Sequence, residues 1–174
     1  MAPADLQSLL QEFLDSCEAS LDTIPTFEPG LGGAPARSFI SPGQPQYDCD
    51  CSGDGQLTVH SPAINSDPIE AIKNHERLNI VTLQATILRC GQVWAEGGGP
   101  PDPTDAEETA AQVNADAWAL WNHLFNLISA EQLFSVCSKI FWDGLRSITP
   151  QGGCVGWVLT LRVEWDGYQE VIGT

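Results

Sequence analysis

The chain has 174 residues, 43% of them hydrophobic and 17% charged, so it is long enough to bury a core without metal or disulfide staples. Its net charge of −16 results from 23 acidic and only seven basic residues. Because nucleic-acid binders gain affinity by neutralising phosphates with Lys and Arg, this balance argues against a protein that grips DNA or RNA. Such charge fits either plain solubility or a surface that nucleic acid passes without sticking.

The N-terminal stretch favours neither export nor membrane insertion. No Lys or Arg precedes Arg37, and the early apolar residues are spaced rather than continuous, so we expect no secretory signal peptide. No run approaches the roughly twenty apolar residues of a membrane-spanning helix. We therefore expect the six cysteines to be reduced thiols, with Cys17 and Cys137 acting as small core residues.

The first half of the chain predicts one helix followed by strands. Residues 5–21 repeat apolar side chains at spacings of three and four, which indicates an amphipathic helix that Asp5 can cap. Residues 36–40 form a short candidate strand. Residues 56–60 alternate apolar and polar side chains and predict a second strand, which we expect Pro62 to end. Residues 78–92 predict a long strand.

The strongest break, residues 97–103, is rich in Gly and Pro and predicts a loop before a long helix over residues 104–128. Thr104 followed by Glu107 matches a capping box. The expected buried stripe of this helix consists of Ala110, Val113, Ala117, Leu120 or Trp121, Leu124 and Ile128. Ser129 followed by Gln132 repeats the capping signal and predicts a shorter helix over residues 130–136.

The last part of the chain predicts a β-hairpin. Residues 155–165 carry an apolar side chain at nearly every second position, residues 139–149 are rich in Ile, Phe, Trp and Leu, and a turn sequence joins them. One face of this hairpin needs a cover, for which the long helix is the best candidate. The whole order predicts a single α+β domain over residues 1–174: a mostly antiparallel sheet of about four or five strands with an N-terminal helix and a long central helix packed on one face.

Residues that could bind a metal or catalyse a reaction do not form a recognisable motif. Cys49, Cys51, His60, His75 and Cys90 are the candidates for a soft metal site, but one residue separates the paired cysteines and no second pair follows. The acids Asp48, Asp50 and Asp54 resemble a calcium loop without its twelfth-position Glu. Nucleophile elbows and phosphate-binding loops are missing too. We expect no metal, no cofactor and no enzyme activity.

The six tryptophans fall into two groups. Core packing accounts for Trp118, Trp121, Trp157 and Trp165, which lie at helix or strand positions. Trp94 and Trp142 are harder to place, and we interpret them as subunit-interface anchors, because Trp is enriched at subunit contacts.

Four patterns resemble the neck proteins of long-tailed phages of actinobacteria, and are most similar to the tail terminator group. They are the run RSFISPGQP at residues 37–45 with an Asp and a Cys after it, DGQLTV at 54–59, a strand that ends in LRC at 88–90, and DAWALW at 116–121 before GGCVGW at 152–157. The similarity covers residues 37–165. The adaptor and stopper proteins of the same neck are the alternative.

The resemblance implies a structural virion protein, assembled in the host cytoplasm, that forms a hexameric ring at the head-proximal end of the tail tube. Such a ring ends tube polymerisation, contacts the major tail tube protein and the head connector or stopper protein, and lets DNA pass through its lumen without specific binding. No catalytic residue is carried over. We expect some of the following acids to face the lumen or an adjoining ring: Asp48, Asp50, Asp54, Glu96, Asp102, Asp105, Glu107 and Glu108.

Overall fold

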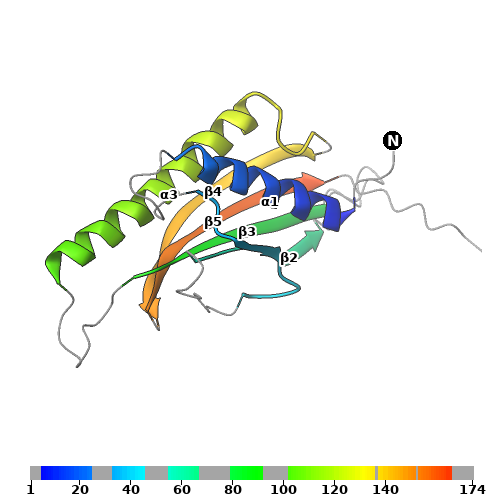
Figure 1. Cartoon of the computed structure of the whole chain (residues 1–174). Coiled ribbons are helices and arrows are strands. Elements are labelled where there is room, and N and C mark those ends of the chain that lie inside the picture. The colour runs from blue at the N-terminus through cyan, green and yellow to red at the C-terminus, as the bar shows by residue number, and fades with distance from the viewer. Residues whose placement is uncertain are drawn as a thin grey trace, which may run out of the picture.

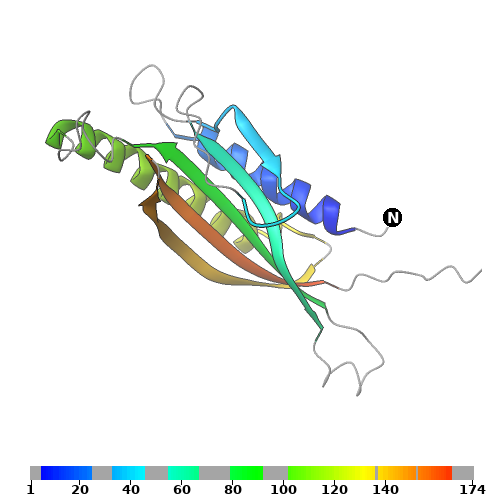
Figure 2. The same ribbon diagram turned by 90° about the horizontal axis from the view of Figure 1, so that it is seen from below.

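A computed structural model of the chain describes residues 5–24, 33–45, 55–66, 79–91, 102–135, 137–151 and 153–165. In chain order the elements are α1 (Leu6–Asp22), β1 (Arg37–Ile40), β2 (Gln56–Ser66), β3 (Asn79–Cys90), α3 (Pro103–Ser129), β4 (Cys137–Gln151) and β5 (Cys154–Trp165). The described strands form one sheet in the order β1-β2-β3-β5-β4, and both helices cover the same side of it (Figures 1 and 2). The predicted α+β architecture is confirmed.

The sheet is antiparallel except at one edge. β1 pairs with β2 in parallel, whereas β2 with β3, β3 with β5 and β5 with β4 are antiparallel. Because side chains alternate across a strand, β5 turns Leu159, Leu161 and Val163 toward the helices, where each is completely buried. This is the alternation that the sequence predicts for the hairpin.

The helix α1 begins and packs as its sequence predicts. The Asp5 carboxylate accepts a hydrogen bond of 2.7 Å from the Ser8 backbone N–H and so caps the helix. One side of the helix is buried on the sheet, with Phe13, Cys17 and Leu21 completely inaccessible to solvent. Burial in this apolar core raises the pKa of the Cys17 thiol.

The helix α3 starts one residue earlier than expected, and its cap differs. Asp102, not Thr104, is the N-cap: its carboxylate accepts a 2.8 Å hydrogen bond from the Thr104 N–H. Pro103 then occupies the first turn, where its missing N–H costs nothing. The capping-box prediction is therefore wrong by two residues, because the sequence offers two side chains that are able to cap.

Two further boundary predictions are wrong. The strand β2 does not end at Pro62; a register irregularity between His60 and Ala63 places the exposed proline outside the regular pairing, and the strand continues to Ser66. The short helix over residues 130–136 is also wrong, because residues 130–135 form turns in which Glu131 and Phe134 have φ values of 56° and 55°. The Glu12 carboxylate of α1 accepts the Phe134 N–H at 2.6 Å and holds this turn.

The cysteines only partly follow the sequence expectation. Cys90 and Cys154 are disulfide-bonded, which contradicts the expectation of reduced thiols at these positions. Cys17 and Cys137 remain thiols, the first buried and the second packed partly against the core, as predicted. Sequence spacing could not identify the oxidised cysteines, because a strand pairing brings Cys90 and Cys154 opposite each other from positions 64 residues apart.

Candidate interaction surface

An aromatic stripe on the outer side of α3 is the most unusual surface of the described structure. Trp118 is 67% exposed, Phe125 52% and Trp121 37%. Spacings of three and four residues place the three side chains on one side of the helix, and Ala111 and Asn114, both exposed, continue that side toward the N-terminus. We call the outward side of α1 and α3, which includes these aromatic residues, the helix face.

The prediction that Trp118 and Trp121 are core residues is wrong, because both side chains are exposed. The residues of α3 that are fully buried are Asp116, Leu120 and Leu124. Ala110, expected in the buried stripe, is exposed. The available signal was the helical period itself: a helix whose core side holds Leu120 and Leu124 must turn Trp118 and Phe125 outward.

A buried ion pair fixes which side of α3 faces the sheet. Arg89 on β3 donates two hydrogen bonds to the Asp116 carboxylate, at 2.8 and 2.9 Å, and a third of 2.7 Å to the Gly33 carbonyl. Both charged side chains are 1% exposed. Burial raises the pKa of the Asp116 carboxyl, while the hydrogen bonds and charge of Arg89 act in the opposite direction. Because Asp116 is tied to β3, Trp118 cannot turn inward.

Trp142, which we predict to be an interface anchor, contacts Trp121 and the core of its own chain. Its ring meets Trp121 edge-on with a centroid separation of 4.8 Å, and it lies against the core. Its indole N–H is buried without a hydrogen-bond partner among the described residues. Trp142 thus packs between Trp121, at the margin of the stripe, and the core. Trp94, the other predicted anchor, lies outside the described residues.

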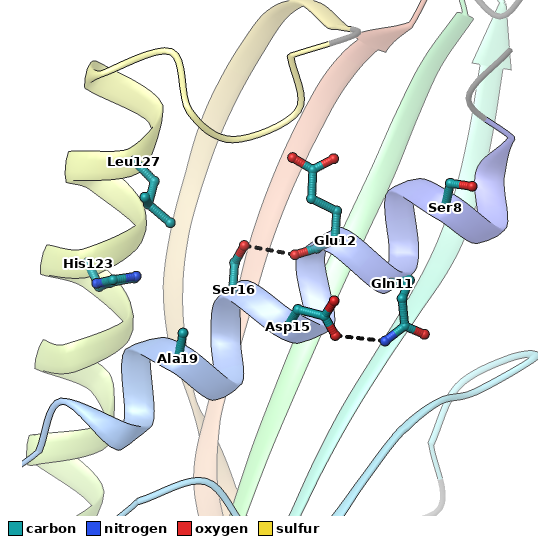
Figure 3. A pocket seen from close by; sticks show the side chains of 8 residues that line it. All are labelled: Ser8, Gln11, Glu12, Asp15, Ser16, Ala19, His123 and Leu127. Atoms are coloured by element: carbon teal, nitrogen blue, oxygen red, sulfur yellow. Dashed lines mark hydrogen bonds between the residues drawn. The ribbon is translucent and has the colours of Figure 1, made fainter. Parts of the chain in front are cut away.

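A shallow, open groove of about 530 Å³ runs between α1 and α3 (Figure 3). It is lined by Ser8, Gln11, Glu12, Asp15, Ser16, Ala19, His123 and Leu127. Its polar groups are largely used within the chain: Gln11 donates to the Asp15 carboxylate at 2.7 Å, and the Ser16 hydroxyl donates to the Glu12 carbonyl at 2.8 Å. A second hollow of about 430 Å³ shares His123 and reaches Trp118. These features suit contact with another surface better than enclosure of a small molecule.

Surface charges are segregated between the two sides of the molecule. Residues 5–24 and 102–135, which contain both helices, include no Lys or Arg. We call the side of the sheet away from the helices the open sheet face. Strand alternation and register place on it the side chains of Arg37, Phe39, Lys139, Phe141, Arg146 and Arg162.

Several groups on the open sheet face already interact with one another. Arg162 forms a two-pronged ion pair with Asp143, at 2.7 and 2.8 Å, and its guanidinium lies 5.6 Å from the centre of the Phe141 ring. The Asp143 carboxylate raises the pKa of the Arg162 guanidinium. Lys139 pairs with Glu164 at 3.0 Å. Arg146 is exposed and makes no ion pair with a described residue.

The predicted lumen acids are only partly placed. Asp102, Glu107 and Glu108 are exposed and Asp105 is half-buried, and all four lie at the N-terminal end of α3. Asp102 serves as the cap, and the others suit the positive end of the helix dipole. Asp48, Asp50, Asp54 and Glu96 lie outside the described residues.

The candidates for metal binding are also divided. Cys49, Cys51 and His75 lie outside the described residues, and Cys90 is disulfide-bonded. His60 is 2% exposed, and its ring nitrogens have no hydrogen-bond partner among the described residues. Within the described part of the chain, no three His, Cys, Asp or Glu side chains gather in a way that could hold a metal ion.

Comparison with models of known protein families gives no match, and comparison with curated proteins gives none either. Of the helices in the described part, none combines the length and apolar character needed to cross a membrane.

Proposed function

We propose that the protein is a structural subunit of a phage neck, a tail terminator that assembles into a ring, because residues 37–165 resemble that group of proteins. The observation that carries the proposal is the aromatic stripe. Burial of a tryptophan or phenylalanine side chain stabilises a complex by about 1.5–3 kcal/mol or more. Because Trp118 and Phe125 are exposed, a partner that covers them would therefore bind with a favourable free energy.

The patterns that carry the resemblance meet in three dimensions. Arg89, from the LRC pattern, pairs with Asp116, the first residue of the DAWALW pattern. A Cβ at Gly55 would lie 2.0 Å from the Leu88 carbonyl oxygen, and one at Gly156 would lie 1.9 Å from that of Ile87. Gly55 of the DGQLTV pattern and Gly156 of the GGCVGW run therefore permit close approach to the strand that carries Arg89. Residues from these patterns thus hold β3, its neighbouring strands and α3 together as one structural unit, with the aromatic stripe of α3 on its outside.

The charge distribution supports a ring through which DNA passes. The N-terminal end of α3 carries four acids and no cation. Placed along a lumen, such a surface repels phosphates and prevents DNA from adhering. In this proposal the subunits bind the major tail tube protein on one side of the ring and the head connector on the other, and the protein catalyses no reaction.

The proposal is tested by tube assembly. Purified tail tube protein of the same phage, polymerised alone, should give tubes of unrestricted length. Addition of this protein should cap the tube ends and stop growth, because a terminator ring occupies the site of the next tube ring. Tube lengths are measured by electron microscopy, and the mass of the free or tube-bound assembly gives the number of subunits. Tubes that grow unchanged, with this protein bound only to the head connector, would instead assign it to the adaptors or stoppers.

A further inference from the structure

The two faces of the molecule have complementary chemistry. The helix face exposes two tryptophans and a phenylalanine among acids, and no Lys or Arg lies in the segments that form it. The open sheet face has the exposed cation Arg146, which pairs with no described carboxylate, beside the ion pairs Arg162–Asp143 and Lys139–Glu164. Electrostatic complementarity of this kind selects partners and orients them.

The aromatic groups complement each other as well. On the open sheet face, Arg162 lies over Phe141, which is 38% exposed, and Arg37 lies 5.7 Å from the centre of the Phe39 ring. Among aromatic side chains, the indole ring of Trp is the most favourable partner for a stacked guanidinium group. Trp and Arg are also the residues most often found at the energetic centre of an interface. Trp118 and Trp121 on one surface and Arg146 with Arg162 on the other are therefore matched partners.

We propose that the helix face of one copy docks on the open sheet face of the next copy, with Trp118 and Phe125 seated against Arg146 and the Arg162–Phe141 pair. The docking rests on the proposed ring and supplies its subunit contact. Two different surfaces meet, so every copy keeps one free surface of each kind and assembly closes only when the ring is complete.

Symmetric alternatives are electrostatically less favourable. Two helix faces brought together would juxtapose surfaces that have acids such as Asp15 and no Lys or Arg. The size is adequate for the head-to-tail contact. The 27 residues of α3 span about 40 Å and the 17 residues of α1 about 25 Å, so two helices of about 10 Å width cover on the order of 650 Å², within the roughly 600–1,000 Å² that one partner contributes to a standard interface.

The test uses two full-length variants that each disable one face. Trp118→Glu changes the helix face and Arg146→Glu changes the open sheet face; both residues are exposed, so neither change disturbs the core. Each variant alone should lose assembly, with the dissociation constant raised at least about 30-fold, the effect of removing an interface hot spot. Ile64→Ala is the matched control, because Ile64 is 54% exposed but belongs to neither face. It should assemble like the unchanged protein.

Mixing the two variants gives the decisive result. Each retains the face that the other lacks, so an equimolar mixture should form heterodimers that grow no further, detected by native mass spectrometry. Assembly of either variant at the unchanged affinity, or a mixture that stays monomeric, would overturn the docking. The ring proposal fails separately: if the heterodimers form but the unchanged protein gives open chains rather than a closed ring, the docking stands and the terminator role does not.

Discussion

His60 shows how a single residue links the fold to pH. It lies on the polar side of β2 opposite Gln84, is 2% exposed, and has two ring nitrogens without a described hydrogen-bond partner. Burial lowers the pKa of its imidazole, because the charged form cannot be solvated there. The folded chain therefore favours the neutral form of the His60 imidazole more strongly than the unfolded chain does.

We predict that this burial makes stability depend on pH. The unfolded chain binds a proton at His60 as the pH falls below its ordinary pKa of about 6.5, whereas the folded chain resists protonation. The stabilisation is thus complete above that pH and is lost as the pH falls toward the lowered pKa, by up to about 1.4 kcal/mol per pH unit. Urea unfolding of the unchanged protein and of His60→Gln between pH 7.5 and 5.5 measures it. Parallel pH profiles for the two proteins would contradict the prediction.

At the level of residues, roles that depend on local spacing were predicted from the sequence, whereas the exposure of single side chains was not. The sequence predicted the Asp5 cap and the inward side of β5, because these follow from local spacing. It misjudged Trp118, because a large apolar residue is usually interpreted as core. The exposure of Trp118 follows from the burial of Asp116 on the opposite side of the helix. A buried aspartate is stable only because Arg89, 27 residues earlier, neutralises it, and no local sequence pattern shows that pairing.

The Arg89–Asp116 ion pair is the main polar link between the elements β3 and α3. We predict that Asp116→Asn costs about 3–5 kcal/mol of unfolding free energy, because it leaves the buried Arg89 charge without its counter-ion. The double variant Arg89→Met with Asp116→Leu should recover much of this loss, since it removes both buried charges. Chemical denaturation of the single and double variants gives the coupling energy between the two residues.

Asp143→Asn is a matched control for this element-level prediction. Asp143 and Arg162 form the same two-pronged geometry, but both side chains are substantially exposed, at 32% and 48%. Water screens such a pair, so the change should have a much smaller effect than Asp116→Asn. Equal losses for the two substitutions would show that burial does not decide the strength of these pairs.

At the level of elements, strongly periodic segments were predictable and their ends were not. The amphipathic α1 and the alternating β5 appear nearly within their predicted bounds. The turn at residues 130–135 was mistaken for a helix because Glu12, more than a hundred residues earlier, caps the Phe134 N–H. Long-range contacts of this kind override local propensity, and a single sequence does not contain them in readable form.

The whole molecule separates its charge in a way that the net value of −16 conceals. The composition predicts an anionic protein, and an anionic surface along a lumen would repel DNA. The described cations, however, are not scattered: apart from buried Arg89, they lie on the open sheet face. In the proposed head-to-tail ring these cations face the aromatic part of the next helix face, around Trp118 and Phe125, and the acids at the start of α3 lie outside that contact and are left for the lumen.

The lumen proposal predicts the effect of reversing one of these charges. Glu108→Lys places one new cation per subunit at the exposed start of α3, and a ring multiplies it by the number of copies. The assembled variant should bind double-stranded DNA at low salt, with log affinity falling by about 0.9 per tenfold rise in salt for each phosphate neutralised. Phage particles that carry it should eject their DNA more slowly.

Glu131→Lys provides the control, because it makes the same charge change at the opposite, exposed end of α3. Native mass is measured first for both variants, so that a lost ring is not mistaken for a changed lumen. DNA binding and slow ejection by Glu108→Lys alone would place the start of α3 along the DNA path. Identical behaviour of the two intact rings would remove Glu108 from the lumen, and loss of the ring in Glu108→Lys would assign this acid to a subunit contact instead.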